Sequence, residues 1–111
     1  MATEFRTTAT ANTGTTAVTV YTASAGISSS TIIGFSIANV GTSTIEVDAR
    51  ISINGAANAV HLVKDAPVPV GGALVVAGGD QKLVLKTNDE LIVQSNTASS
   101  ADSVISILES S

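Results

Sequence analysis

The chain has 111 residues and a net charge of −4. This length provides for one domain, because a single hydrophobic core typically takes about 100–150 residues. The basic side chains, Arg6, Arg50, Lys64, Lys82 and Lys86, form no stripe that would neutralise a phosphate backbone, which argues against nucleic acid as a partner. Cysteine is absent, which excludes disulfides and thiolate metal sites.

Hydrophobic residues make up 44% of the chain but aromatic residues only 3%, so Val, Ile, Leu and Ala must fill the core. The many β-branched residues are typical of pleated sheets and disfavour long helices. The charged fraction is 13%, against roughly 25% in ordinary soluble domains. We therefore expect part of the surface to be covered by protein.

The hydropathy pattern shows no run near the ~20 apolar residues that a membrane span needs. The N-terminus also lacks the apolar stretch of a secretory signal. We expect a protein that is made and kept soluble, without a membrane partner.

The first fifteen residues, 1–15, are rich in Thr and Ala and fit either an N-terminal arm or an extra strand. Their periodicity does not decide between the two. Residues 16–111 are expected to form the β-sandwich domain. Its first strand is predicted over residues 17–22, with Val18 and Val20 inward.

Residues 31–40 predict the next strand. Ile33, Phe35 and Ile37 fall on one face of it by the alternation of side chains along a strand. Gly41 supplies the turn that follows.

The clearest pattern in the chain runs from residue 44 to residue 54, where apolar and polar residues alternate without error. We predict that the apolar set is buried and the polar set more exposed, because a one-residue slip would turn every side chain to the other face. The apolar set is Ile45, Val47, Ala49, Ile51 and Ile53. The polar set is Glu46, Asp48, Arg50 and Ser52. A turn at Asn54–Asn58 and a return strand over 59–64 complete a hairpin.

Residues 66–72 contain Pro67 and Pro69, which lack the N–H that a continuous ladder needs. This stretch is therefore predicted to be an edge or a crossing loop. Gly71 and Gly72 are expected to supply backbone angles with positive φ.

Four more short strands follow, separated by turns and by a loop rich in Ser, Thr and Ala over 96–101. They are predicted at residues 74–77, 81–86, 90–95 and 102–109, and the turns between them at 78–80 and 87–89. About eight strands at roughly 8–12-residue intervals indicate an all-β protein. We predict an antiparallel β-sandwich, Ig-like or jelly-roll-like, with the N-terminal arm as the alternative to a further strand.

His61 is the one histidine of the sequence, and a Ser-His-Asp arrangement would have to use it. It lies in a predicted apolar strand, where a histidine usually packs on a sheet face. No Gly-x-Ser-x-Gly motif supplies a nucleophile. We expect that the protein is not an enzyme.

The carboxylates form two pairs, Glu46 with Asp48 on one strand face and Asp89 with Glu90 at a turn. Such pairs can form a calcium site or a glycosidase pair, but charges on a wet strand face explain the first pair and no EF-hand spacing is present. Gly78 and Gly79, before Asp80, are interpreted as a turn, because no Walker lysine follows them. We assign no catalytic, cofactor-binding or metal-binding residue and expect no cofactor.

The aromatic residues Phe5, Tyr21 and Phe35 are scattered along the sequence. They are too few to form a stacking platform for bases or sugars.

Three motifs carry a resemblance to a known group of proteins. They are Thr-Ile-Ile-Gly-Phe-Ser-Ile-Ala-Asn at 31–39, Val-Lys-Asp-Ala-Pro-Val-Pro at 63–69 and Gly-Gly-Asp-Gln-Lys at 78–82. The chain, over about residues 16–110, resembles small virion structural proteins of tailed bacteriophages, common among phages of cyanobacteria and marine bacteria. The resemblance implies a virion protein made in the host cytoplasm. It favours a capsid decoration or cement protein bound to the major capsid protein, with a collar, neck or tail-associated part as the runner-up.

Two functions remain open on the residues alone. One is a structural cement protein, and the other is a host-surface binding module that uses the loops at 54–58 and 96–101. The mean hydropathy of +0.42 also predicts a homo-oligomer, because a thin sandwich cannot hide so much apolar surface. The resemblance favours a trimer.

Overall fold

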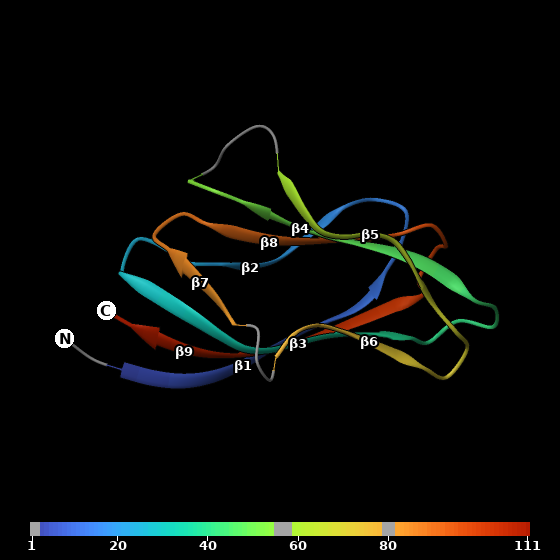
Figure 1. The fold of residues 1–111 in the computed structure, drawn as a ribbon, viewed down its shortest axis with the longest axis horizontal. Helices are drawn as coiled ribbons and strands as arrows, with labels where there is room; N and C mark the ends of the chain where they lie inside the picture. The colour runs from blue at the N-terminus through green and yellow to red at the C-terminus, as the bar shows by residue number, and fades with distance from the viewer. Residues whose placement is uncertain (1–2, 55–58, 79–81) are drawn as a thin grey trace.

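The computed structural model describes residues 3–54, 59–78 and 82–111. Within these ranges nine strands form two antiparallel sheets that pack face to face, which confirms the predicted β-sandwich (Figure 1). The strands are β1 Thr3–Thr13, β2 Val18–Thr22, β3 Ser29–Asn39, β4 Ile45–Ser52, β5 Val60–Val68, β6 Ala73–Ala77, β7 Leu83–Lys86, β8 Glu90–Ser95 and β9 Ala101–Ser110.

The strand order is that of a jelly roll. One sheet has the order β1-β9-β3-β6, with β7 also paired to β3, and the other has the order β2-β8-β4-β5. Apart from β7, the strands form one long antiparallel ribbon. In this ribbon β1 pairs with β9, β2 with β8, β3 with β6 and β4 with β5. Rolling this ribbon up brings β3 beside β9 and β4 beside β8. Of the two predicted variants, the jelly-roll-like one is therefore present.

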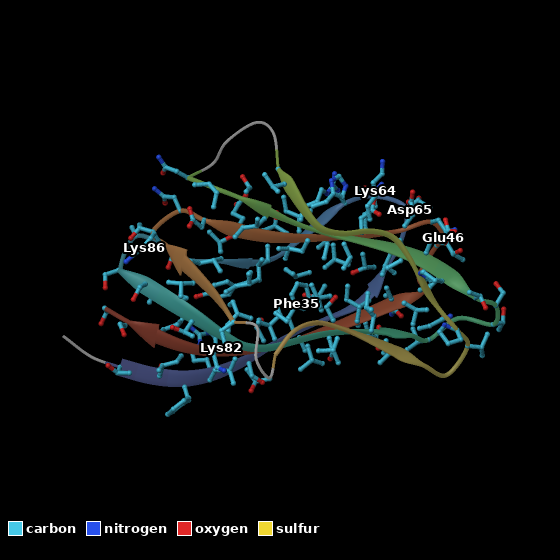
Figure 2. The ribbon with its side chains drawn as sticks, in the orientation of Figure 1. Phe35, Glu46, Lys64, Asp65, Lys82 and Lys86 are labelled. Atoms are coloured by element: carbon cyan, nitrogen blue, oxygen red, sulfur yellow. The ribbon has the colours of Figure 1, made fainter. Side chains whose placement is uncertain are left out.

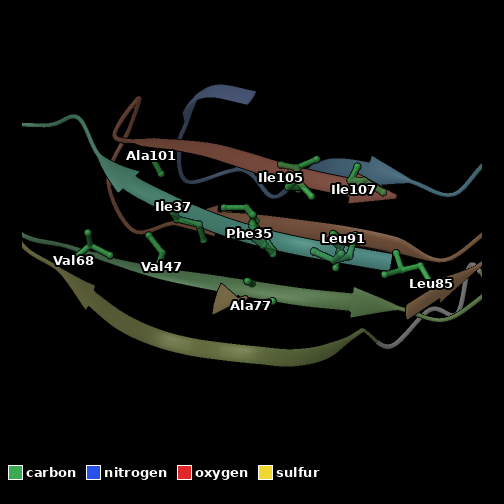
Figure 3. Packing of buried hydrophobic residues seen from close by; sticks show 14 of the residues in the cluster. Phe35, Ile37, Val47, Val68, Ala77, Leu85, Leu91, Ala101, Ile105 and Ile107 are labelled. Carbon is green, nitrogen blue, oxygen red and sulfur yellow. The ribbon is translucent and has the colours of Figure 1, made fainter. Parts of the chain in front are cut away.

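The core lies between the two sheets and consists of aliphatic side chains around a single large ring, Phe35 (Figure 3). Leu91 of the four-stranded sheet faces this ring, and Ile105 and Ile107 of β9 lie beside it. Each of these side chains is at most 1% exposed. Full burial of such a side chain stabilises the fold by about 1.5–3 kcal/mol, so the thin core relies on many medium-sized contributions.

The alternation predicted for residues 44–54 holds only in its first part. The apolar residues as far as Ala49 are buried, and the polar residues between them and Arg50 are exposed or half-buried. Beyond this point the prediction is wrong: Ile51 is half-buried, Ser52 is buried and Ile53 is 52% exposed. The strand ends at Ser52, so the next side chain is no longer held over the core.

The face predicted for residues 31–40 needs one correction, at Ile33. Phe35 and Ile37 are buried as predicted, but Ile33 is partly exposed and Ile32 is buried instead. The register against β9 shifts between Ile32 and Gly34, which is a β-bulge. An extra residue in one strand reverses the side on which the following side chains lie, and periodicity alone does not reveal it.

The proline-containing stretch serves both predicted purposes. Pro67 lies in β5, the edge strand of the four-stranded sheet, and the residues after Pro69 cross to β6 of the other sheet. Gly71 has a positive φ of 75°, as expected for this turn, but the prediction is wrong for Gly72, whose φ is not positive. The predicted turns at 54–58 and 78–80 fall largely outside the described residues.

The N-terminal stretch, for which an arm and a strand were both open, contains β1. This strand pairs along β9, with Thr3 opposite Ser110, so the two ends of the chain lie side by side (Figure 1). No helix long and apolar enough to cross a membrane occurs in the part of the chain that the structure describes.

Candidate interaction surface

The outer surface of the five-stranded sheet has an unusual composition. On β9 the odd-numbered residues from Ala101 to Glu109 are buried, so the even-numbered ones point outward, together with their partners on β1, β3, β6 and β7. We call the following set the uncharged face: Phe5, Thr7, Ala9, Thr31, Ile33, Ser36, Val75, Val84, Val104, Ser106 and Leu108. Among the described residues of this surface, charges occur at its margins, on Lys82, Lys86 and Asp102.

The register aligns this face into two rows across the sheet. One row is Phe5, Leu108, Thr31 and Val84, and the other is Ala9, Val104, Ser36 and Val75. Phe5 is 75% exposed and Val75 is 69% exposed. Single exposed apolar residues are ordinary, but aligned ones on one sheet face make this face the candidate interaction surface.

A hollow lies between the two rows, beside the β-bulge. Its volume is about 290 Å³, and its lining includes Phe5, Ile33 and Ser106. A Cβ added to Gly34 would meet nothing within 4 Å, so the sheet is open above this glycine.

The outer surface of the four-stranded sheet differs sharply from the uncharged face. It carries Glu46, Asp48, Arg50, His61 and Glu90. Figure 2 shows Glu46 on this side, together with Lys64 and Asp65 of β5. The guanidinium of Arg50 donates a hydrogen bond of 2.9 Å to the Oε1 atom of Gln94 on the neighbouring strand. These charges keep this side solvated.

His61 lies on β5, opposite Arg50 in the register. Its Nε2 atom is 4.0 Å from Oδ2 of Asp48, and its side chain is 39% exposed. A contact of this length on an exposed edge strand is a weak surface ion pair at most.

The carboxylate pairs weighed from the sequence do not converge. Asp89 is buried and accepts hydrogen bonds from the backbone N–H groups of Asn54 and Lys86, at 2.8 and 2.9 Å, so it locks a turn. Glu90 points to the opposite side of the chain, where Thr22 donates to it at 3.4 Å. Across the described residues there is no group of three or more His, Asp or Glu side chains that could hold a metal ion.

Of the two loops predicted as a host-binding site, the first, at 54–58, lies largely outside the described residues. Ser52, before the first loop, pairs with Glu90, whereas Ser95, before the second loop, pairs with Val47 at the other end of β4. The second loop is also held internally, since Ser100 Oγ bonds Ser95 Oγ at 2.6 Å. The strand ends that lead into the two loops, Ser52 and Ser95, therefore lie at opposite ends of β4.

A buried polar network between the sheets was not predicted. Glu109 is only 5% exposed. It accepts a hydrogen bond of 2.7 Å from the Tyr21 hydroxyl and forms an ion pair with Arg6 at 3.3 Å. Because the Tyr21 hydroxyl has one proton, the 2.6 Å contact with Ser30 makes the serine the donor to Tyr21. Burial is the main reason why the pKa of Tyr21 is raised to about 12. The hydrogen bond with Ser30 lowers this pKa, and Glu109 raises it.

This network lines a second hollow of about 290 Å³, on the open side of the sandwich between β1 and β2. Threonine hydroxyls of both strands complete its lining. The sequence did contain a signal for it: Glu109 has the same parity as the inward Ile105 and Ile107, and an ionisable residue at an inward position requires a buried partner.

Comparisons with known proteins give the fold and no family. No family model matches the sequence, and no curated protein sequence matches it. A solved structure of Bacillus endospore appendages, described as a family of disulfide-linked pili, superposes with a TM-score of 0.53 at 13% identity, over 98% of this chain and 87% of the other. A structure of infectious bursal disease virus, Gx strain, gives a TM-score of 0.51 at 13% identity over 96% of this chain.

The chain spans 29% of the matched viral protein, so it corresponds to one part of that protein. At 13% identity, both likenesses concern the fold alone. The class that the fold and the surface define is a jelly-roll β-sandwich with one charged and one uncharged sheet face.

Proposed function

We propose that this protein is a structural subunit of a bacteriophage virion, a capsid decoration or cement protein that binds the shell through contacts with the major capsid protein. The observation that carries the proposal is the uncharged face, an aligned surface of apolar and hydroxyl side chains on one side of the sandwich. In this proposal the protein is not an enzyme and needs no cofactor. Its function is to bind the shell.

The fold supports this proposal in a general way. Jelly rolls recur in viral capsid domains and in lectins. Two of the similar solved structures are a pilus and a virus, both repeating assemblies. The motifs at 31–39, 63–69 and 78–82 add the resemblance to virion proteins of tailed phages.

The surface chemistry explains how such binding would work. Apolar contacts contribute about 25 cal/mol per Å² removed from water, and the valines and Phe5 supply such area without the desolvation cost of charges. Hydroxyls such as those of Thr31 and Ser36 can bond to backbone groups of a partner. The charged sheet then faces solvent and keeps a coated particle soluble.

The test is the amount of this protein in purified phage particles, measured by quantitative mass spectrometry against the major capsid protein. Hundreds of copies per particle are expected for a cement protein. A few to a few tens of copies would instead support the runner-up, a collar, neck or tail part. Absence from intact particles contradicts both.

A further inference from the structure

We propose that two copies of this chain pair through the edge strand β1, antiparallel and about a two-fold axis at Phe5, so that their five-stranded sheets merge into one. The partner is a second copy of the chain itself. This contact does not depend on the virion function proposed above.

The β1 edge differs from the other sheet edges. From Thr3 opposite Ser110 to Thr10 opposite Ser103, β1 pairs with β9 without a register shift, and it is the last strand of its sheet. Its far side therefore presents a straight row of backbone N–H and C=O groups to solvent. Such a row is a template for another strand.

The other edges carry features that hinder strand addition. β5 contains Pro67, two register shifts and Asp65 at a positive φ of 51°. β2 is short and has a shift between Thr19 and Tyr21. On the far side of the five-stranded sheet, β6 and β7 are two short pieces rather than one edge. Proteins protect sheet edges in these ways, and β1 shows none of them over its first part. The charges that it does carry there, on Glu4 and Arg6, have opposite signs.

The geometry of antiparallel pairing restricts the register. A two-fold axis between paired strands is perpendicular to the sheet, so residues opposite each other lie on the same face. Phe5 and Thr7 point to the uncharged face, and Glu4 and Arg6 to the other side. The axis therefore passes between two copies of one β1 residue.

Charge selects among these registers. An axis at Glu4 would place two carboxylates opposite each other, and an axis at Arg6 two guanidinium groups, both of which are unfavourable. An axis at Phe5 places Glu4 of each copy opposite Arg6 of the other. Arg6 bonds Glu109 through one Nη atom while its side chain remains 57% exposed, so it is accessible to a second carboxylate. The axis at Phe5 also forms a cross-strand aromatic pair.

The pairing would extend the uncharged face. Because the axis is perpendicular to the sheet, both outer faces lie on the same side, with the two Phe5 rings at the centre. The hollow lined by Phe5 and Ile33 then flanks this centre once in each copy. A two-fold contact is the elementary unit here, rather than the trimer that the family resemblance favours.

Cysteine crosslinking tests the register, since the chain has no cysteine of its own. Opposed residues of antiparallel strands have Cα atoms about 4.5–5.5 Å apart, within the roughly 4.4–6.8 Å that a disulfide accepts. We expect Phe5→Cys to oxidise to a disulfide dimer at least tenfold faster than Thr7→Cys on the same strand and Val75→Cys on the distant β6. A faster reaction at Thr7, or equal reaction at Val75, overturns the proposal.

A charge reversal tests the same contact without a crosslink. Glu4→Lys would place the lysine of each copy opposite Arg6 of the other copy. We therefore expect at least a tenfold weaker dimer by sedimentation equilibrium. Glu46→Lys makes the same change of charge on the other sheet, where Glu46 is also exposed, and is expected to leave the dimer unchanged. Circular dichroism verifies that both variants are folded. Equal effects of the two variants, or a wild-type chain that is monomeric at tens of micromolar, contradict the pairing.

Discussion

The two outer faces of this sandwich are built on the same core but have opposite chemistry. The four-stranded sheet presents Glu46, Asp48 and Arg50 in the alternation typical of a wet surface. The five-stranded sheet presents valines, hydroxyls and Phe5 at the equivalent positions. Both faces satisfy the backbone equally well, so the fold does not require the difference. We attribute the difference to what each face contacts in the proposed assembly.

The largest expected effect separates the core from both faces. Phe35→Ala removes the fully buried ring, and we expect a loss of about 3–5 kcal/mol in the free energy of unfolding, measured by denaturant titration. Phe5→Ala is the matched control, because the same ring is removed from a 75% exposed position. It should change the unfolding free energy of the monomer by no more than about 0.5 kcal/mol. A large loss on Phe5→Ala would mean that this ring is part of the core.

The second prediction compares the uncharged face with an exposed position in the other sheet. Val104→Lys puts an unpaired charge in the middle of the uncharged face, and we expect at least a tenfold loss of binding to purified particles, because the charge must be desolvated. Val60→Lys makes the same substitution at an exposed valine of β5, in the other sheet. It should bind as the wild type does. The reverse order of effects would assign the contact to the charged sheet.

The third prediction concerns the network that joins the two sheets. Tyr21 is the only tyrosine, so its ionisation can be followed directly by absorbance. A pKa of about 12 in the folded state lies above the ordinary value of 10.0. Folding therefore favours the protonated phenol, and this stabilisation is complete below pH 10 and is lost as the pH rises towards 12.

Tyr21→Phe should remove that pH dependence and cost about 1–2 kcal/mol at neutral pH, because Glu109 loses a buried donor. Denaturant unfolding between pH 8 and pH 11.5 measures both effects. A titration midpoint near 10 in the folded protein would contradict the network.

The smallest expected effect is at the lone histidine. His61→Gln should change the unfolding free energy by less than about 0.5 kcal/mol and leave particle binding intact, because its contact with Asp48 is long and exposed. Abolished binding by a folded variant would show that the charged face takes part in function.

The sequence predicted the sheets better than their surfaces. The strict alternation around Val47 identified β4, and β8 was predicted with its observed bounds. The strand β1 stayed undecided because an edge strand made of Thr and Ala is exposed on both sides and has no apolar period. Ile33 was placed wrongly because a bulge depends on the partner strand and not on its own sequence.

Composition predicts that the protein has apolar surface to cover, but not where the candidate interaction surface lies. A low charge and a high hydropathy imply that apolar surface exists, but not which strands share it. The face assembles residues from both ends of the chain, such as Phe5 and Leu108, which the register sets opposite each other. The link between Tyr21 and Glu109 joins residues 88 positions apart, which no local pattern contains.

Hydroxyl-radical footprinting of the protein, free and assembled on particles, tests the central claim most directly, because it reports which side chains lose contact with water. Protection of Phe5, Val104 and Leu108, with His61 unchanged, is the result that we predict. Protection of His61 and its neighbours, with the uncharged face still reactive in the assembled state, would contradict the assignment of the contact to the five-stranded sheet.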